Sequence, residues 1–408
     1  MMTLEPIITS PIETDLYKIN MLAVVLSQFN MDRTRWAFRC RNKDVKFTPE
    51  MIAEIRAQID WYCHNVRFTA EDITYLKKAC PWLKQSFLDF LRFWRPFREE
   101  IFINEENIQP YNDCGLAIEC VGPQTSVMMY EIPILAIVNE VYFSFKYGAN
   151  AKLVEFQKRT VQKFEDLKNG KYDVGVFSEF GLRRRYSKAA QDWLVNYMVD
   201  QKVPGFVGTS NVYLAKKYGV RPIGTCAHEM FQLLQGHHEY NPAYVNRLVM
   251  KAWTKEFKTS NGIMLTDCIT TDCFLLDFDE TYAKQFDGVR HDSGDPIAWG
   301  EKILAHYKKF NIDATQKTLL FSDSLDFERA TQIKKYFEGR CKIAFGIGTW
   351  LANDCGVPTL NIVHKMVECN GAPTAKISDV EGKGMCRDSE YVDYLKRCIS
   401  WRLRHEQQ

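Results

Sequence analysis

Seven short apolar runs between residues 174 and 354 each end abruptly in polar and reactive side chains. Each run has the length of a buried strand, and the residues that follow it are drawn from Thr, Ser, Asp, Arg, His and Gly. The segments read VGVFSEFGLRRR, VPGFVGTSN, VRPIGTCAHE, GIMLTDCITTD, DGVRHDSGDP, TLLFSDSLD and KIAFGIGTW. Ligands of parallel α/β folds bind outside the carboxyl ends of the strands, so we expect one active site assembled from many loops.

The segment FGIGT at 345–349 is suited to binding a phosphate group. Its glycines, Gly348 among them, let backbone N–H groups approach phosphate oxygens, and Thr349 adds a hydroxyl donor. In barrel folds a phosphate site often follows the last strands, which is where this segment lies. A simple tight turn is the alternative explanation for these glycines.

The segment at 288–296 places Arg290, Asp292 and Ser293 close together in the chain. An arginine neutralises an anion, and a carboxylate accepts hydrogen bonds from ribose hydroxyls or holds Mg²⁺ through water. Asp323, which follows the strand TLLF, is a second carboxylate of the same kind. We favour a site for a polyhydroxylated, phosphorylated ligand over a solvated turn with an internal arginine–aspartate pair.

His228 follows another strand end, close in sequence to the hydroxyl of Thr225. Imidazole titrates near neutrality, so His228 is a candidate base or nucleophile, with a purely structural role as the alternative. Phe180 precedes three arginines at 183–185, of which one or two would line an anionic site while the others pair with acids. Neither GxxxxGK[ST] nor GxGxxG occurs, which argues against a P-loop and a dinucleotide-type Rossmann site. The loops together predict a phosphorylated-sugar site with Mg²⁺, an aromatic pocket and a reactive histidine.

Composition places the chain among globular proteins with a large core. Its 408 residues exceed a typical single domain, and 46% are hydrophobic against 25% charged. A net charge of +2 argues against a general nucleic-acid or membrane role. The N-terminus lacks the pattern of a signal peptide, and the apolar stretches read as too short to span a bilayer. The 13 cysteines show no CxxC spacing, which predicts reduced, mostly buried thiols in a cytoplasmic or nuclear protein.

The elements that must position these loops differ between the two parts of the chain. Residues 1–170 have the mixed pattern of an α+β domain. The expected helices are 14–29, with Thr14 as its cap, 49–65, 69–95 and 133–147, and the expected strands are 36–41, 116–123 and 124–134.

From residue 171 onward strands alternate with helices. This repetition predicts a parallel sheet, and the number of units favours an irregular (β/α) barrel, the catalytic domain, over 171–358. The last segment, 359–408, carries a hairpin signal at Asn370-Gly371. We expect its strands and helix to return to the N-terminal domain and to complete part of it.

The loop motifs closely resemble those of the nicotinate phosphoribosyltransferase family, which are type II phosphoribosyltransferases. TDLYKINM, EFGLRRR, GTSN, GTCAHE, TDCITTD, VRHDSGDP, FSDSLD, FGIGT and TLNIVHKMVECNG stand in the family's order over nearly the whole chain. The resemblance implies phosphoribosyl transfer from 5-phosphoribosyl-1-diphosphate to nicotinate, which yields nicotinate mononucleotide and diphosphate for NAD synthesis. It also implies ATP hydrolysis coupled through a phosphohistidine, Mg²⁺ bound with the two phosphorylated substrates, and a cytoplasmic homodimer with shared active sites.

The resemblance further implies a role for individual motif residues. His228 is the residue that ATP phosphorylates. The residues implied to contact nicotinate are Tyr17, Phe180, Thr225 and Arg290. The residues implied to bind phosphoribosyl diphosphate are Asp292, Ser293, Asp323, Gly348 and Thr349. No direct protein metal cluster is implied, because Mg²⁺ binds through the substrate phosphates, near Asp292 or Asp323.

Two other functions stay open at this point. The same fold can act on another pyridine, nicotinamide or quinolinate, and Arg290 would discriminate among them by neutralising the nicotinate carboxylate. A catalytically silent nucleotide-sensing scaffold is the second alternative. The intact His228, Asp292 and Thr349 argue against it.

Overall fold

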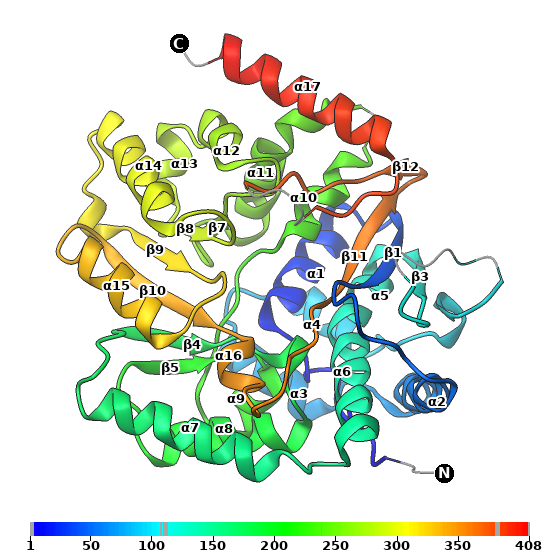
Figure 1. Ribbon diagram of the computed structural model, residues 1–408. Helices are drawn as coiled ribbons and strands as arrows, with labels where there is room; N and C mark the ends of the chain where they lie inside the picture. Colours follow the sequence, from blue (N-terminus) through cyan, green and yellow to red (C-terminus); the bar gives the residue numbers. More distant parts are fainter. Residues whose placement is uncertain (1–3, 107, 109–112, 238, 380–383, 407–408) are drawn as a thin grey trace.

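Two β-sheets with helices packed around them make up the protein (Figure 1). The structure is a computed structural model that describes residues 4–106, 108, 113–237, 239–379 and 384–406. One sheet is parallel and the other antiparallel, so the mixed α/β class expected from the sequence is confirmed.

The parallel sheet is built from the seven apolar runs, each of which forms one strand. Its strands, in spatial order, are β6 (Arg221–Pro222), β5 (Phe206–Thr209), β4 (Val176–Glu179), β10 (Lys342–Ile347), β9 (Thr318–Phe321), β8 (Gly288–His291) and β7 (Ile263–Leu265). Every ladder between neighbours is parallel. The sheet curls into a half-barrel and not a closed ring, because β6 and β7 are edges with no ladder between them among the described strands.

Helices connect these strands, and polar residues from the strand-end motifs begin several of them. The helices are α8 (Lys188–Asp200), α9 (Val212–Tyr218), α10 (His228–Gln235), α11 (Val245–Phe257), α12 (Thr271–Asp277), α13 (Glu280–Gln285), α14 (Pro296–Lys309), α15 (Phe327–Phe337) and α16 (Thr349–Ala352). The side chains of Asn211, Asp295 and Asp326 accept hydrogen bonds from backbone N–H groups in the first turns of α9, α14 and α15. Part of the polarity at the strand ends is therefore helix capping.

The antiparallel sheet joins the two ends of the chain. Its order is β12 (Ala372–Pro373), β11 (Ile362–Cys369), β1 (Arg33–Cys40), β3 (Ile118–Pro123) and β2 (Ile101–Ile103), so the C-terminal strand β11 lies beside β1. The predicted hairpin is present: Asn370 and Gly371 have φ of 53° and 81° between β11 and β12. Positive φ at both central residues suits Asn-Gly.

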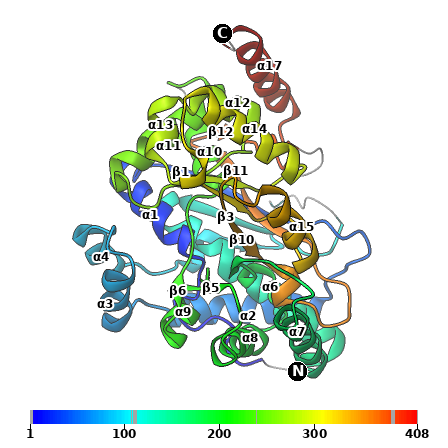
Figure 2. The same ribbon diagram turned by 90° about the vertical axis from the view of Figure 1, so that its left-hand side faces the viewer.

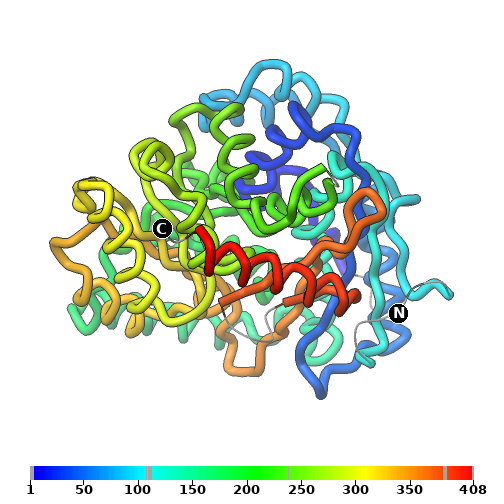
Figure 3. The backbone as a smooth tube through the Cα atoms, turned by 90° about the horizontal axis from the view of Figure 1, so that it is seen from above, coloured from blue at the N-terminus to red at the C-terminus, as the bar shows by residue number. Residues whose placement is uncertain are grey.

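The remaining helices cover this sheet, the space between the two sheets and, in the case of α7 and α17, the helices of the parallel half. They are α1 (Leu16–Gln28), α2 (Pro49–Asn65), α3 (Ala70–Ala79), α4 (Gln85–Leu91), α5 (Gln124–Val127), α6 (Glu131–Tyr147), α7 (Leu153–Lys168) and α17 (Ser389–His405), with short 3₁₀ turns at 98–100, 128–130, 182–184, 242–244 and 314–316. Helices α3 and α4 project from one side of the body (Figure 2), and α17 lies across its outer face (Figure 3).

Three local predictions for the N-terminal part are wrong. The segment 124–134 is helical and not a strand, and 69–95 is split into α3 and α4, because Pro81 lacks an N–H and disfavours helix in the residue before it. Thr14 does not cap α1: Asp15 holds the cap position, and the Thr14 hydroxyl has no partner among the described residues.

Helix α1 lies between the two sheets and is buried over most of its length (Figure 1). The helical segment 124–147 is long and apolar enough to cross a membrane, contrary to expectation, yet 94% of its apolar window is buried inside the protein. This segment is a core helix of the fold. The thirteen cysteines are free and mostly buried, as expected.

Candidate active site

A cavity of about 540 Å³ lies at the carboxyl end of the parallel sheet, closed on its other side by residues around β1 and β11. Nine of the ten residues selected from the sequence line it: Tyr17, Phe180, Thr225, His228, Arg290, Asp292, Asp323, Gly348 and Thr349. The tenth, Ser293, lies outside the lining, since its buried hydroxyl bonds the carboxylate of Asp267 at 2.5 Å. The ligand contact expected of Ser293 stays a prediction, and in the structure its hydroxyl donates to Asp267.

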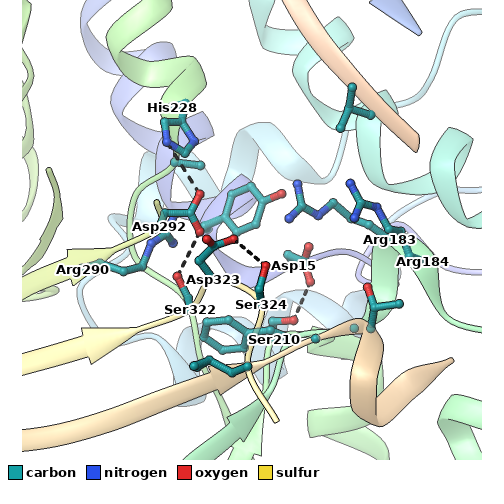
Figure 4. Close-up of a pocket in the computed structure, with 18 of the residues that line it drawn as sticks. Asp15, Arg183, Arg184, Ser210, His228, Arg290, Asp292, Ser322, Asp323 and Ser324 are labelled. Atoms are coloured by element: carbon teal, nitrogen blue, oxygen red, sulfur yellow. Dashed lines mark hydrogen bonds and ion pairs between the residues drawn. The ribbon is translucent and has the colours of Figure 1, made fainter. Parts of the chain in front are cut away.

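His228 is the first residue of α10 and faces two carboxylates, of which Figure 4 shows Asp292. Its Nε2 lies 2.8 Å from Oδ1 of Asp267 and 3.7 Å from Oδ2 of Asp292. Burial, reinforced by the charge of Lys376, lowers the pKa of His228 to about 4, so the ring is neutral at physiological pH. A carboxylate only accepts hydrogen bonds, so Nε2 carries the proton and Nδ1 keeps its lone pair.

Asp267 and Lys376 are functional residues that sequence reasoning missed. Lys376 places its ammonium 2.9 Å from Oδ2 of Asp267, and both side chains are buried. Against the effect of burial, His228 and Lys376 hold the pKa of Asp267 well below its usual value. Asp267 stands in the strand-end motif LTDCITTD, which could have indicated it, whereas Lys376 follows the hairpin at the far end of the chain.

His228, Asp267 and Asp292 offer ligand atoms within 4.8 Å of one another, a spacing that could hold a metal ion. Asp267, however, already binds His228, Ser293 and Lys376. The ammonium of Lys376 supplies the positive charge that a cation would bring. Asp267 is thus better suited to orienting His228 than to binding metal.

Glycines bring Phe180 against the FGIGT segment. A Cβ on Gly346 would lie 2.3 Å from the Phe180 ring, and one on Gly181 would lie 2.2 Å from Cβ of Ala352. The backbone N–H of Phe180 donates to the carbonyl of Ile347 at 2.9 Å. The aromatic ring therefore lies beside the proposed phosphate turn because neither glycine can carry a side chain.

The carboxylate of Asp292 is held in place by its neighbours. The hydroxyl of Ser322 shares its single proton between Oδ1 of Asp292, at 3.1 Å, and the carbonyl of His291, at 2.9 Å. Against the effect of burial, Arg290 and His228 lower the pKa of Asp292, so the carboxylate is ionised. Arg290 is buried, and its Nε has no hydrogen-bond partner among the described residues. A buried guanidinium with a free donor suits an anionic ligand group.

The three consecutive arginines separate as the sequence predicted. Arg183 and Arg184 line the cavity on the side opposite Arg290 (Figure 4). Arg185 points elsewhere and binds Glu13 at 2.7 Å in a buried ion pair.

The wall opposite the parallel sheet comes from residues that the sequence did not indicate. Lys365 on β11 lines it, and burial together with the nearby Lys376 lowers the pKa of Lys365 to about 8. The side-chain ammonium of Lys365 makes no hydrogen bond or ion pair within the part of the chain that the structure describes. The further residues of this wall are Asp15, Arg41, Thr359, Leu360, Asn361, Val363 and Lys376.

Tyr17 and Asp15 reach the cavity from within the same chain. Asp15 accepts a hydrogen bond from the Ser210 hydroxyl at 2.6 Å, and the backbone N–H of Leu16 donates to the carbonyl of Ser210. A Cβ on Gly224 would lie 2.6 Å from the backbone nitrogen of Tyr17. The start of α1 is therefore inserted at the end of β5 and β6, next to the loop that leads to His228.

Known proteins share this sequence and architecture. Residues 176–401 match the model of the nicotinate phosphoribosyltransferase (NAPRTase) family, and residues 12–139 match the model of the NAPRTase N-terminal domain. The chain is 40% identical over 396 residues to nicotinate phosphoribosyltransferase of Cupriavidus necator, covering 97% of this chain and 98% of that one. It is 42% identical over 397 residues to that of Bordetella pertussis, covering 96% and 95%.

Solved structures agree in fold. The crystal structure of nicotinate phosphoribosyltransferase from Porphyromonas gingivalis superimposes with a TM-score of 0.88 at 32% identity, covering 97% of this chain and all of that one. The enzyme from Vibrio cholerae gives a TM-score of 0.88 at 33% identity, covering 99% and 98%. The similarity thus extends over both sheets and the cavity between them.

Proposed function

This chain belongs to the nicotinate phosphoribosyltransferase family, and we propose that its cavity transfers the phosphoribosyl group to nicotinate with ATP hydrolysis coupled through His228. The overall reaction converts nicotinate, 5-phosphoribosyl-1-diphosphate, ATP and water into nicotinate mononucleotide, diphosphate, ADP and phosphate. Its product feeds NAD synthesis. The observation that carries the proposal is the neutral, carboxylate-bound His228 in one cavity with Arg290 and the FGIGT turn.

The pyridine ring of nicotinate is assigned to the part of the cavity lined by Phe180, Tyr17 and Thr225. An aromatic side chain orients a flat ring at little cost in conformational freedom. Arg290 lines the cavity and then pairs with the nicotinate carboxylate through its guanidinium. Nicotinamide and quinolinate carry a different charge, so this contact is the source of selectivity.

The phosphoribosyl group is assigned to the FGIGT turn and the two carboxylates beside it. Gly348 and Thr349 offer backbone and hydroxyl donors to the 5′-phosphate, while Asp292 and Asp323 accept from the ribose hydroxyls. The carboxylate of Asp292 is ionised and lines the cavity, so it also fits Mg²⁺ that arrives with the substrate phosphates. Bound Mg²⁺ would neutralise charge on the departing diphosphate.

Transfer at the ribose anomeric carbon needs little proton chemistry. The pyridine nitrogen attacks as the diphosphate leaves, and the sugar passes through an oxocarbenium-like state. The leaving group gains negative charge, which cations positioned in advance stabilise. Arg184 and Lys365 line the wall that faces the phosphate turn and are assigned this task.

His228 is proposed to carry the phosphoryl group at Nδ1. Asp267 holds the Nε2 proton, so Nδ1 is the nitrogen free to attack the γ-phosphorus of ATP, with ADP as leaving group. Water later attacks the phosphohistidine and releases phosphate. Phosphorylation places a charge of about −2 beside the cavity, which changes its affinity for anionic substrates and products.

We also propose a cytoplasmic homodimer. Asp15 and Tyr17 line the cavity of their own chain. In a dimer with shared active sites, the partner subunit would therefore contribute residues other than these two. Sedimentation of the purified enzyme at micromolar concentration distinguishes a dimer from a monomer.

Activity measured with and without ATP on three pyridines tests the proposal. We expect diphosphate release with nicotinate, stimulation by ATP, and little reaction with nicotinamide or quinolinate. Equal turnover of nicotinamide would contradict the role of Arg290. Absence of diphosphate release with all three pyridines would favour the silent scaffold.

A further inference from the structure

A buried ion cluster lies directly behind the cavity, formed by Lys18, Glu131 and Glu229. The ammonium of Lys18 is fully buried and lies 2.6 Å from Oε2 of Glu131 and 2.5 Å from Oε2 of Glu229. It also lies 4.6 Å from the centre of the Trp36 ring. None of the three charged residues lines the cavity. Burying such a cluster is costly unless all its charges are paired.

Each residue of this cluster is adjacent in the chain to a cavity residue or forms an ion pair with one. Glu229 follows His228 in the first turn of α10. Glu131 also binds Arg183, whose Nη1 lies 3.3 Å from its Oε1, and Arg183 lines the cavity. Lys18 itself follows Tyr17 at the start of α1. One ammonium therefore connects the segments that carry the proposed phosphohistidine, an arginine and a residue of the pyridine pocket.

The charges of the two carboxylates are unequal. Although burial alone would raise it, Lys18 and Arg183 lower the pKa of Glu131 to about 2. Burial raises the pKa of Glu229 to about 7 despite Lys18, and its Oε1 has no hydrogen-bond partner among the described residues. Glu229 is therefore the carboxylate of the pair that is more readily protonated.

We propose that Glu229, Lys18 and Glu131 are positioning residues that couple the phosphorylation state of His228 to the cavity wall at Arg183 and Tyr17. The inference rests on the proposed phosphohistidine. Without the cluster, phosphorylation and phosphoribosyl transfer both proceed, but ATP is consumed without nucleotide formation.

The route follows from electrostatics. His228 and Glu229 are consecutive residues in the first turn of α10, so a phosphoryl group on His228 adds negative charge at the residue that precedes Glu229. This charge favours uptake of a proton from solvent by Glu229. The charged groups that face Glu229 are Lys18 on α1, Glu131 on α6 and Lys365 on β11. Lys18 then pairs with Glu131 alone, which weakens the hold of Glu131 on Arg183.

The test compares Glu229→Gln with wild type and with a matched control, Asp277→Asn. Asp277 forms a buried ion pair with Arg402 at 2.9 Å, and neither residue lines the cavity. Three quantities are measured: phosphoenzyme formed from γ-labelled ATP, nicotinate mononucleotide formed without ATP, and ATP consumed per nucleotide formed.

For Glu229→Gln we expect phosphoenzyme and ATP-independent transfer at wild-type levels, with the ATP consumed per nucleotide raised by about fivefold. Asp277→Asn should lose thermal stability and keep the wild-type ratio. If Glu229→Gln forms phosphoenzyme but consumes the wild-type amount of ATP per nucleotide, the proposed coupling is overturned and the proposed function stands. If the wild-type protein forms no phosphoenzyme, the proposed function itself is overturned. If Glu229→Gln does not fold, Glu131→Gln is tested in its place, because it removes the ion pair with Arg183. We expect the same rise in ATP consumed per nucleotide, and a wild-type ratio would again contradict the coupling.

Discussion

The two walls of the cavity differ in how they are built. The wall of the parallel sheet consists of strand ends and of the segments that follow them, and it contains His228, Arg290 and Asp292. The opposite wall consists of the start of α1 and of strands that return from the C-terminus, with Lys365 and Lys376. His228 and Arg290, which are assigned to react and to select the substrate, lie on the first wall, and the cations Lys365 and Lys376 lie on the second.

The difference shows which functional residues a fold rule can locate. Every parallel strand ends at the same edge of its sheet, so residues after these strands converge whatever the details of packing. No such rule places Lys376, which reaches Asp267 from 109 residues further along the chain. If the first wall carries the chemistry and the second tunes it, substitutions on the first wall should have the larger effects on activity.

Replacing His228 on the parallel-sheet wall should have the largest effect. In His228→Ala the acid-labile phosphoenzyme disappears and the ATP-stimulated rate falls to the slow ATP-independent rate, because no other group takes the phosphoryl. Labelling with γ-labelled ATP and assays with and without ATP measure both. The exposed His405 gives a control, His405→Ala, that should behave as wild type. Phosphoenzyme retained in His228→Ala would refute the assignment.

Arg290 on the same wall should determine affinity for nicotinate. Arg290→Ala is expected to raise the nicotinate KM by about tenfold or more, since a charge-assisted contact contributes about 1.5–3 kcal/mol. Initial rates over a range of nicotinate measure the change, with Arg404→Ala as an exposed control. An unchanged KM, or an equal loss for nicotinamide, would show that the carboxylate binds elsewhere.

Lys365 on the returning wall should have a smaller effect that depends on pH. Lys365→Met is expected to weaken binding of phosphoribosyl diphosphate about fivefold, as for one lost contact of about 1 kcal/mol. Since its pKa is lowered to about 8, chiefly by burial, the ammonium is charged below pH 8 and loses its charge above it. Wild-type affinity should therefore fall as pH rises through 8.

Calorimetric titrations of phosphoribosyl diphosphate between pH 7 and pH 9 measure this dependence. Lys365→Arg should remove it, because a guanidinium keeps its charge. Lys335→Met changes an exposed lysine and serves as control. A loss of activity in Lys365→Met as large as that in His228→Ala would contradict the proposed difference between the two walls.

Lys376 should change little at neutral pH and more in acid. Burial first and Lys376 second lower the pKa of His228 to about 4, so Lys376→Met should raise it toward the ordinary value of about 6.5. Phosphorylation requires the neutral ring, so as pH falls the variant loses phosphoenzyme formation at a higher pH than wild type does. Wild type stays active to lower pH. Rates of phosphoenzyme formation between pH 4.5 and pH 7.5 are compared for Lys376→Met and wild type. Identical pH profiles would contradict the role of Lys376.

The same shift affects folding stability. A histidine whose pKa is lower in the folded state than in the unfolded state contributes stability above the unfolded value, and that contribution is lost as pH falls toward the folded value. His228 is therefore expected to favour unfolding between about pH 6.5 and pH 4. In Lys376→Met this part of the pH dependence should shrink.

Much of the parallel half could be predicted because its signals are local. Each strand is an apolar run that stops at a polar turn, and the helix after it shows its own periodicity. The errors lie where packing decides the outcome. Residues 124–130 are buried on all sides, so their apolar pattern cannot distinguish a strand from a helix. Asp267 was not selected from the sequence, since only geometry shows that its carboxylate lies against His228.

The sequence by itself determined the seven strand ends, the hairpin at Asn370-Gly371 and the family motifs, because all of these depend on neighbouring residues. Only the tertiary structure decided that Asp267 holds Nε2 of His228 and that Lys376 and Lys365 face the cavity. It also decided that Lys18 joins Glu131 to Glu229. These are contacts between distant parts of the chain, and they form because burial brings charges together that must then be paired.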